Sequence, residues 1–501
     1  MTHVSFRDGA PVELEADYVV VGSGAGGASC AVALARGGAE VAIVEAGAWR
    51  DPEDYPSSTY GAMRDLFDEW GTQIARGRAL WPIVQARTVG GTTVINSAIC
   101  VRTPGDIFAQ WEREHGVGGD RMAERAWAAQ DRIEEELCVE EVPEPARGHS
   151  NRLAMLGAER AGYESHWIER YVRGCLGAGQ CLQGCTSLRK QSTNLNYVPE
   201  VIERGGTVVS SAPVRRVRLE GRRAVGVEGR FSHPATRKAG ARFFVRARKA
   251  VVIAASATHS PALLIRSGVR SPALGRFFRA HPGTGVFGVY DEPVDMNVGA
   301  TQGWASTAYR ESPGLKLETL SIPFEMVASR LAGGGVTLMR RLLEYRHICM
   351  WVHAVRAESI GTVSNGLGDK PVVKYGLDRA DMERFRQGMI LVAKTHVAAG
   401  CTKIIPGIFG MPYEITPDQV HLLEDAPLDP RAYIAILSHL FGGCTMGSDP
   451  SRSVVNGSGR VHGYEGLVVA DASVIPTNLG VNPQHTIMAL GMLFAEDLLA
   501  A

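Results

Sequence analysis

The most regular pattern of apolar and polar positions lies at residues 17–47. An apolar run leads into three glycines with the spacing G-x-G-x-x-G, small residues continue to position 35, and a second apolar run ends in an acidic residue. This order predicts a strand, a tight turn, a helix and a second strand. The positions that define the motif are Gly22, Gly24, Gly27 and Glu45.

Each residue of this motif has a physical role in binding a dinucleotide. Gly22 permits the tight turn, Gly24 lets a pyrophosphate approach the backbone, and Gly27 lets the helix pack closely on the strand. The phosphates then lie at the helix N-terminus, where unpaired N–H groups and the helix dipole favour anions. Glu45 ends the second strand, where its carboxylate is suitably placed to accept hydrogen bonds from a ribose diol. The motif therefore predicts an adenine-dinucleotide site without saying which dinucleotide binds.

Shorter patterns predict the remaining elements. Apolar positions spaced for one helix face run through Asp120–Leu137, and two further helices are predicted at residues 331–343 and 379–399. A last helix is predicted to open at Pro483, with Asn482 as its N-cap. Short apolar or alternating runs predict strands at residues 207–211, 224–229, 243–247, 250–254, 286–290, 317–321, 347–355, 362–363 and 467–470.

Length and composition are those of a globular protein with more than one domain. The 501 residues exceed what one compact core normally holds, so we expect two intertwined or consecutive domains. Hydrophobic residues make up 45% of the chain and charged residues 21%. The 53 basic residues balance the 53 acidic ones, so nothing in the net charge favours nucleic acid or an anionic membrane.

The pattern of charged and apolar residues shows no signal for export. The N-terminal residues show no basic stretch followed by an apolar core, so no secretory signal is expected. No stretch approaches about 18 uninterrupted apolar residues, so no transmembrane helix is expected. The nine cysteines are an odd number scattered along the chain, as is typical of free thiols in a reducing compartment. These features predict a cytoplasmic protein.

A second glycine-rich loop follows at residues 86–96. Two hydroxyl residues come directly after Gly90 and Gly91, so backbone N–H groups there can face phosphates or a flat ring. Together with the N-terminal motif, this loop resembles the first signature of the glucose-methanol-choline (GMC) oxidoreductases, flavoproteins that bind FAD. The resemblance implies that Gly90, Gly91 and Asn96 lie along the diphosphate and the flavin. Some relatives carry a covalent flavin bond on a histidine beside this asparagine; here Ile95 stands at that place, which implies noncovalent FAD.

The middle of the chain extends the resemblance. Residues 256–269 resemble the second GMC signature, which this chain leaves at Arg270, where a glycine is usual. Val214 follows the strand predicted at 207–211, at a position that supplies backbone contacts to the adenine in relatives. These signatures resemble FAD sites and disfavour an NAD-dependent enzyme.

The C-terminal block carries the candidate chemistry. His439 lies beside a glycine-rich loop, Asp471 ends a buried strand, and Asn482 precedes the last helix. This order resembles the C-terminal block of GMC enzymes, most closely those that oxidise sterols and long-chain alcohols. The resemblance implies that His439 is the catalytic histidine and Asn482 its partner, next to a helix whose positive end lies near the flavin. It also implies that Asp471 contacts the ribityl and diphosphate region of FAD.

These residue types suit the oxidation of an alcohol. An alcohol gives up a hydride readily only as its hydroxyl proton leaves, so a base with a pKa near neutrality is needed beside the carbinol oxygen. His439 is that base, and Asn482 can donate a hydrogen bond to the developing alkoxide. The hydride passes to flavin N5, so the protein mainly supplies position and electrostatics.

Three features leave alternatives open. His485 stands three residues after Asn482 but outside the family's catalytic position, and we interpret it as structural or as lining the site. Glu325 is either a carboxylate base, as in some sterol-oxidising relatives, or half of an ion pair, which we favour. Three close cysteines either hold a metal or cluster or are free thiols in a glycine-rich turn, which we favour; they are Cys175, Cys181 and Cys185. The stretch from Cys181 to Ser192 also resembles long-chain alcohol oxidases.

The sequence therefore predicts an α/β protein with a discontinuous Rossmann-like FAD-binding domain and a substrate domain built on a mainly antiparallel sheet with helices. The FAD-binding domain is expected at residues 1–50, 86–130, 190–285 and 435–501, and the substrate domain at residues 51–85, 131–189 and 286–434. No metal is assigned to the site.

The predicted activity is oxidation of a hydrophobic alcohol, such as a sterol, a long-chain or an aryl alcohol, to a ketone or aldehyde. Oxygen, a quinone or an electron-transfer protein would accept the electrons. Two alternatives remain: a hydroxynitrile-lyase-like enzyme of the same fold that does not turn FAD over, and a flavin-binding protein without catalysis.

Overall fold

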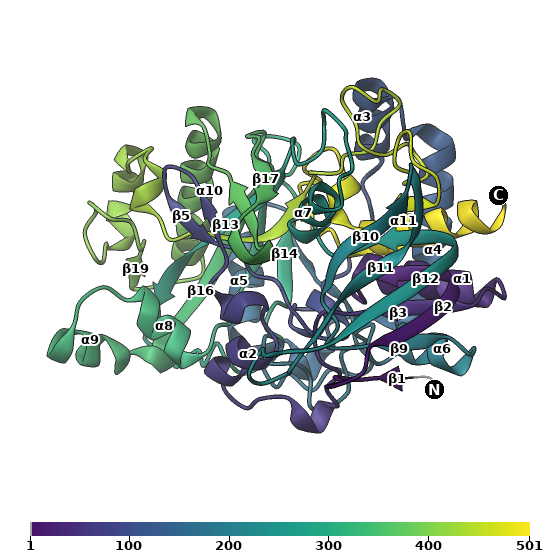
Figure 1. Ribbon diagram of the computed structural model, residues 1–501. Helices are drawn as coiled ribbons and strands as arrows, with labels where there is room; N and C mark the ends of the chain where they lie inside the picture. Colours follow the sequence, from purple (N-terminus) through teal and green to yellow (C-terminus); the bar gives the residue numbers. More distant parts are fainter. Residues whose placement is uncertain (1–2) are drawn as a thin grey trace.

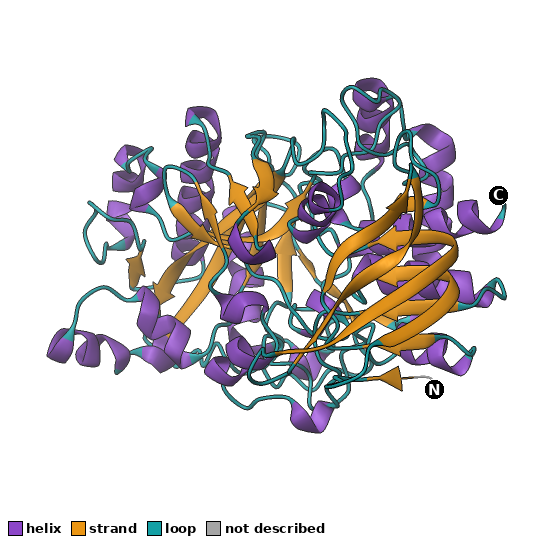
Figure 2. Ribbon diagram, in the orientation of Figure 1, coloured by secondary structure: helices purple, strands orange, loops and turns teal. Residues whose placement is uncertain are grey.

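Two large sheets, each covered by helices, form the body of the protein (Figures 1 and 2). The computed structural model describes residues 3–501. The first sheet lies on the right in Figure 1, next to both chain termini, and the second lies on the left. Within the described residues, no helix is both long and apolar enough to cross a membrane.

The first sheet contains the predicted dinucleotide motif. Its strand order is β1-β9-β3-β2-β12-β11-β10, and β21 also pairs with β12. Strands β1, β9, β3, β2, β12 and β21 pair in parallel, whereas β10 and β11 extend the sheet with antiparallel pairing. The strands are β1 (His3–Val4), β2 (Val12–Val21), β3 (Val41–Val44), β9 (Thr207–Val209), β10 (Val214–Glu220), β11 (Arg223–Ser232), β12 (Ala239–Ile253) and β21 (Leu467–Val469).

Helices cover the parallel part of this sheet, which explains its apolar strands. The whole of β3 is buried, as expected for a parallel strand with covered faces. Helix α1 packs against α6 and α11, and α11 packs against α4. These helices are α1 (Ala25–Arg36), α4 (Gly119–Glu136), α6 (Tyr197–Glu203) and α11 (Gln484–Leu499).

The second sheet is entirely antiparallel, as the sequence predicts for the substrate domain. Its order is β19-β13-β16-β15-β14-β7, and β20 also pairs with β13. Helix α10 (Arg379–Ala398) packs on β13 and β16 and against α5 (Gly148–Ala161). The strands are β7 (His166–Trp167), β13 (Arg279–Val289), β14 (Trp304–Ser306), β15 (Leu315–Thr319), β16 (Ile348–Val355), β19 (Lys403–Ile405) and β20 (Ile436–Phe441).

Smaller elements complete the fold. One sheet joins β4 (Ile74–Arg76), β5 (Leu80–Pro82), β17 (Thr362–Asn365) and β18 (Pro371–Lys374), and another joins β6 (Val139–Glu141) and β8 (Glu169–Tyr171). The other α-helices are α2 (Thr59–Asp65), α3 (Gly105–His115), α7 (His259–Arg266), α8 (Phe324–Arg330) and α9 (Gly335–Leu342). Short 3₁₀ helices span Pro52–Asp54, Asp68–Gly71, Gly91–Val94, Glu144–Ala146, Tyr345–His347, Leu367–Asp369, Pro417–Asp425, Pro430–Ala432 and Ala472–Val474.

Most predicted elements are present, and two of the differences in extent have a clear local cause. The strands predicted at 243–247 and 250–254 are one strand, β12, because the register shift between Ala247 and Ala250 absorbs the polar residues between them. The helix predicted from residue 331 begins only at Gly335, because residues 332–335 include Gly333 and Gly335 with positive φ.

Candidate active site

His439 and His281 face each other across two paired strands. His439 lies on β20 and His281 on β13, and the antiparallel register sets them directly opposite. Opposed residues of neighbouring strands project from the same face of a sheet. The two Nδ1 atoms are 3.1 Å apart. His439 was predicted from the sequence but His281 was not, because only the pairing of distant strands brings this second imidazole into the site.

Asn482 reaches His439 from the segment that precedes α11. Its Nδ2 atom is 3.4 Å from His439 Nε2, so the structure brings together the two residues predicted to be catalytic. The prediction that Asn482 caps this helix is wrong: Pro483 is the N-cap residue, and none of the described side chains caps the helix. The side-chain oxygen of Asn482 accepts a hydrogen bond from Lys316 instead.

Lys316 and Glu318 form a buried ion pair beside Asn482. Both lie on β15, two residues apart, so their side chains share one face of the sheet. Lys316 Nζ is 2.5 Å from Glu318 Oε1, and the two residues are only 2% and 5% exposed. This pair was not predicted from the sequence. The signal for it is a pair of opposite charges at alternate positions of an otherwise apolar strand.

Lys316 sets the direction of the hydrogen bonds in this cluster. An ammonium group has no acceptor, so the Asn482 atom that faces it is Oδ1. The amide nitrogen, which only donates, therefore faces His439 Nε2, and that nitrogen must be unprotonated to accept. Neutral His439 then carries its proton on Nδ1 and donates it to His281 Nδ1. The result is a lone pair on His439 Nε2 beside the N–H of Asn482.

Burial keeps both imidazoles neutral at neutral pH. Burial lowers the pKa of His439 to about 4, while Glu318 acts to raise it and Lys316 to lower it further. Burial is the main reason that the pKa of His281 lies well below its ordinary value. The neighbouring His439 and Lys316 lower this pKa further. The pKa of His439 is thus lower than the near-neutral value anticipated from the sequence, but the neutral imidazole is the form that can accept a proton.

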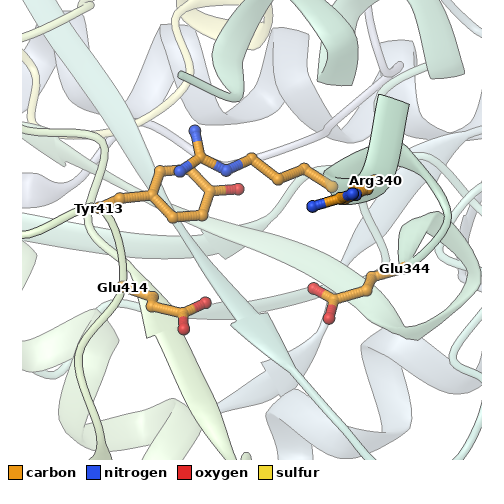
Figure 3. A pocket seen from close by; sticks show the side chains of 5 residues that line it. Arg340, Glu344, Tyr413 and Glu414 are labelled. Carbon is orange, nitrogen blue, oxygen red and sulfur yellow. The ribbon is translucent and has the colours of Figure 1, made fainter. Parts of the chain in front are cut away.

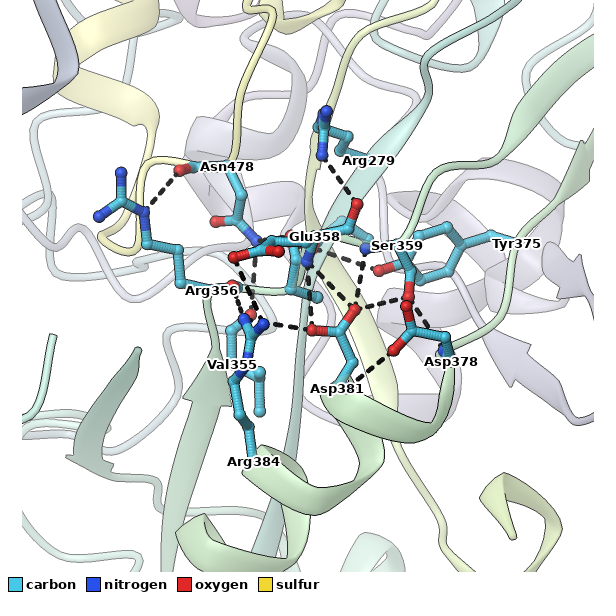
Figure 4. A network of polar contacts seen from close by, with 12 residues as sticks. Arg279, Val355, Arg356, Glu358, Ser359, Tyr375, Asp378, Asp381, Arg384 and Asn478 are labelled. Carbon is cyan, nitrogen blue, oxygen red and sulfur yellow. Dashed lines mark hydrogen bonds and ion pairs between the residues drawn. The ribbon is translucent and has the colours of Figure 1, made fainter. Parts of the chain in front are cut away.

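A polar network fixes the segment before Asn482 (Figure 4). The Asn478 side chain donates to the carbonyl of Ala280 at 2.9 Å, one residue before the histidine of β13. The carbonyl of Asn478 accepts a hydrogen bond from Arg356 Nε at 3.2 Å. Asp381 lies in the same network, where its carboxylate accepts the backbone N–H groups of residues 358 and 359. The network therefore holds the segment that carries Asn482 against the strand that carries His281.

The two glycine-rich loops lie against each other at the end of the first sheet. Gly22 has a φ of +103°, and a Cβ there would lie 2.3 Å from a backbone carbonyl oxygen. Gly91 has a φ of +53°, and its Cβ would lie 2.7 Å from Gly24 Cα. Ser23 Oγ accepts a hydrogen bond from Gly90 N at 2.9 Å. The loops therefore approach each other at a distance that side chains at these positions would prevent.

This arrangement fits a dinucleotide diphosphate. Gly24 is the N-cap of α1, and no side chain in the described part of the chain caps the helix, which leaves its first N–H groups available to an anion. A Cβ on Gly27 would lie 2.1 Å from the Gly22 carbonyl oxygen, so glycine is required for α1 to pack on β2 as predicted.

Glu45 and Asp471 lie just after β3 and β21, at the carboxyl ends of parallel strands, where open α/β sheets bind ligands. Glu45 accepts hydrogen bonds from the backbone and hydroxyl of Ser23 at 2.9 and 2.7 Å. Asp471 accepts the N–H groups of Ser256 at 2.9 Å and Ser473 at 2.8 Å. Burial raises the pKa of Asp471, although these hydrogen bonds act to lower it.

The other predicted cofactor residues lie on the same sheet or loop. Asn96 Nδ2 donates to Gln484 Oε1 at 2.6 Å, which links the second glycine-rich loop to the first turn of α11. Val214 is half-buried at the start of β10.

Two residues with open roles lie apart from His439. His485 is fully buried, and its Nε2 is 3.0 Å from Glu134 Oε1 on α4, which supports the structural interpretation. Glu325 is exposed on α8 and accepts the Thr59 N–H at 3.3 Å. In residues 3–501 it forms no ion pair, so the interpretation that we favoured from the sequence is wrong.

A surface pocket beside α9 is separate from this site (Figure 3). The Arg341 guanidinium lies 3.2 Å from the centre of the Tyr413 ring, and Lys403 pairs with Glu344 at 3.5 Å and Glu414 at 3.7 Å. The charges are therefore largely paired with each other. The lining residues, none of which was predicted to be functional, are Arg340, Arg341, Glu344, Tyr413 and Glu414.

Most of the chain matches a known protein family. The fold and the glycine loops are those of FAD-dependent oxidoreductases, and residues 16–283 and 360–491 match the N- and C-terminal sequence patterns of the GMC oxidoreductases. The chain belongs to this FAD-dependent family, and it has a GMC FAD-binding domain together with a sheet-based substrate domain.

Several relatives match nearly the whole chain. An uncharacterised GMC-type oxidoreductase of Mycobacterium tuberculosis is 34% identical over 98% of this chain and 77% of its own length. The long-chain-alcohol oxidase FAO1 of Arabidopsis thaliana is 26% identical over 96% of this chain and 66% of its own length. Pyridoxine 4-oxidase from Mesorbium loti superposes with a TM-score of 0.70 at 19% identity, covering 96% of this chain and 98% of its own. Formate oxidase superposes with a TM-score of 0.73 at 18% identity, covering 98% and 99%.

Proposed function

We propose that this protein uses FAD to oxidise the CH–OH group of a hydrophobic alcohol to a ketone or aldehyde. The observation that carries the proposal is the hydrogen-bond chain from Lys316 through Asn482 and His439 to His281, which directs a lone pair and an N–H donor to adjacent positions. A base and an oxyanion donor side by side are what removal of a hydroxyl proton requires. Similarity to a long-chain-alcohol oxidase supports a hydrophobic substrate.

In this mechanism the substrate hydroxyl replaces Asn482 as the hydrogen-bond partner of His439 Nε2. This nitrogen accepts the hydroxyl proton while the hydride leaves the carbon that bears the hydroxyl. Asn482 Nδ2 donates a hydrogen bond to the oxygen as negative charge develops on it. The positive charge of Lys316 lies on the other side of that amide and polarises it, which strengthens the donor. FAD bound beside these residues supplies the acceptor for the hydride, and oxygen, a quinone or an electron-transfer protein receives the electrons afterwards.

The cofactor residues follow from the same proposal. Gly22, Gly24 and Gly27 with Gly90 and Gly91 hold the diphosphate. Glu45 holds the adenosine ribose, Val214 contacts the adenine, and Asn96, Asp471 and Asn482 line the flavin side. Binding is noncovalent because Ile95 offers no nucleophile to the flavin ring.

The domain division that we propose is the one expected from the sequence; β20 and most of β13, which pair in the second sheet, fall within its FAD-binding ranges. The FAD-binding domain comprises residues 1–50, 86–130, 190–285 and 435–501, and the rest of the chain forms the substrate domain. The protein is proposed to be cytoplasmic, in line with its nine free cysteines.

Anaerobic flavin spectroscopy tests this function. The purified holoenzyme is mixed with a sterol, a long-chain primary alcohol, an aryl alcohol and a sugar, and the blue absorption band of the flavin is followed. One of the hydrophobic alcohols is expected to bleach the band, and admitting air then separates an oxidase from a dehydrogenase. In His439→Asn, whose amide can still donate to His281, we expect full flavin content and bleaching slowed by roughly 100-fold or more.

The lyase alternative makes the opposite prediction. A hydroxynitrile lyase would split a cyanohydrin into cyanide and a carbonyl compound without bleaching the flavin. Cyanide release with an unchanged flavin spectrum, and no bleaching by any alcohol of the panel, would overturn the redox proposal.

A further inference from the structure

We propose that Cys175 and Cys181 form a peroxide-reactive dithiol site around the buried guanidinium of Arg170. This inference goes beyond the proposed function and does not depend on it, because it concerns a loop whose residues take no part in the His439 site.

Arg170 is the centre of this site. Its side chain is fully buried, its Nη1 lies 3.4 Å from Cys175 Sγ, and its Nη2 lies 3.2 Å from Cys181 Sγ. Its Nε donates to the carbonyl of Ser97 at 2.9 Å. Both sulfurs are therefore held against neighbouring nitrogens of one guanidinium group.

Lys190 adds a second buried cation. It is 3% exposed, and its Nζ donates to the carbonyls of Val94, Asn96 and Cys181. Across residues 3–501, no carboxylate forms an ion pair with Lys190 or Arg170. Two buried positive charges without an acidic partner are costly, because burial of a charge is tolerated only where an opposite charge compensates it.

Cysteine sulfurs are the groups that can supply this compensation. Burial acts to raise the pKa of the Cys181 thiol, but Arg170 and Lys190 lower it to about 7. Burial acts to lower the pKa of Arg170, but Cys181 and Cys175 raise it by more, so the pKa lies above its ordinary value. A large share of Cys181 is therefore thiolate at neutral pH, and the thiolate is the nucleophilic form of cysteine.

The position of the thiols allows reaction with a small oxidant. Cys175 and Cys181 are both partly exposed, in contrast to the fully buried Cys30 and Cys444. The Cys181 thiolate attacks hydrogen peroxide, a sulfur–oxygen bond forms as the O–O bond breaks, and hydroxide leaves, which gives a sulfenic acid. The thiol of Cys175 then attacks that sulfur, a disulfide forms, and water leaves. Two thiols are thus oxidised by two electrons, and one peroxide is reduced.

Lys190 connects this chemistry to the second glycine-rich loop. Its ammonium group bridges the Cys181 carbonyl and the carbonyls of Val94 and Asn96, the last of which belongs to a residue proposed to line the flavin. Lys190 thus links the backbone of Cys181 to the loop at residues 90–96 through one side chain.

To test this proposal, the reduced holoenzyme is treated with increasing amounts of hydrogen peroxide, and the products are analysed by intact mass and peptide mapping. We expect loss of the mass of two hydrogen atoms and a disulfide that joins Cys175 to Cys181. In Cys175→Ser the reaction should stop at a sulfenic acid on Cys181, which dimedone traps, and Cys181→Ser should leave Cys175 reduced at the same dose.

Two other cysteines serve as controls. Cys185→Ser removes a thiol from the same loop that does not contact Arg170, and it should react as the wild type does. Cys138 contacts the exposed Arg173 at 3.0 Å, so it tests whether a guanidinium alone is sufficient. At pH 7 Cys181 should be alkylated roughly tenfold faster than Cys138.

Three outcomes would overturn the proposal. They are equal reactivity of Cys181 and Cys138, a disulfide that involves Cys185 in place of Cys175, and stoichiometric zinc or iron with acid-labile sulfide in the purified protein. The last outcome would mean that the thiolates compensate Arg170 and Lys190 as ligands of a metal or cluster.

Discussion

Lys316 donates a hydrogen bond to the side-chain oxygen of Asn482, and this contact orients the amide toward His439. The relation is directional because an ammonium group cannot accept. Exchange of the amide oxygen and nitrogen would place an N–H group against a cation and a carbonyl against the lone pair of His439 Nε2. The buried lysine thus determines which tautomer of the histidine is stable.

The first prediction concerns this lysine. In Lys316→Met combined with Glu318→Gln, the amide of Asn482 loses its fixed orientation, and flavin reduction by a saturating alcohol should slow by roughly 10- to 100-fold. Both residues are changed because removal of Lys316 alone leaves Glu318 as an unpaired buried charge. Stopped-flow absorbance measures the rate. Glu318→Gln alone keeps the lysine and should lose less activity than the double variant. Equal rates of flavin reduction in the double variant and the wild type would contradict the prediction.

The second prediction concerns His281. In His281→Leu, the Nδ1–H of His439 loses its acceptor, and only the hydrogen bond from Asn482 still favours an unprotonated Nε2, so flavin reduction should slow by roughly 10-fold or more. In His281→Gln a side-chain oxygen can accept the same proton, and part of the rate should return.

Nitrogen NMR of the resting enzyme, labelled at its histidines, reads the tautomer without any substrate. We expect the proton of His439 on Nδ1 in the wild type and a mixture of tautomers in His281→Leu. A wild-type enzyme with this proton on Nε2 would refute the hydrogen-bond assignment even if the enzyme oxidises alcohols.

A third prediction concerns the contact between the glycine-rich loops. In Gly91→Ala the new Cβ would lie 2.7 Å from Gly24 Cα, so the loops must separate and bound FAD should fall well below one per chain. Gly38→Ala is the matched control, because Gly38 also has a positive φ of +81° but nothing lies within 4 Å of its Cβ position. The ratio of flavin to protein absorbance is the measurement. Full FAD content in Gly91→Ala would show that the loops do not need this approach.

Local patterns in the sequence were sufficient for the nucleotide-binding part of the fold. The strand, turn and helix around Gly22 follow from apolar runs and from backbone conformations that only glycine adopts easily, and these are properties of neighbouring residues. The same is true of α10, whose predicted bounds differ from the observed ones by one residue.

The centre of the site could not be predicted in this way. His281 meets His439 across 158 positions of sequence, and Lys316 meets Asn482 across 166, so both contacts depend on strand registers that no local pattern specifies. The predicted cap at Asn482 failed for the same reason. A charged donor from β15 competes for the oxygen that would otherwise bind helix N–H groups.

The last prediction concerns acid stability, which depends on histidines that the fold buries in their neutral form. Burial lowers the pKa of His353 and of His396 to about 3, and of His439 to about 4. Unfolded histidine titrates near pH 6.5, so between that value and the folded pKa the unfolded chain binds more protons. The stability from these residues is complete above about pH 6.5 and falls as the pH decreases, by roughly 2 kcal/mol per histidine between pH 7 and pH 5.

His353 offers the sharpest test of this prediction. Neither ring nitrogen has a hydrogen-bond partner among residues 3–501, and the ring packs against Phe385 with centroids 4.7 Å apart. His353→Leu should therefore keep the packing, lose no hydrogen bond, and reduce the difference in unfolding free energy between pH 7 and pH 5 by roughly 2 kcal/mol. Urea unfolding at the two pH values measures that difference. The exposed His421 is the control, since His421→Leu should leave the difference between the two pH values unchanged. If His353→Leu also leaves that difference unchanged, His353 is not held neutral by burial.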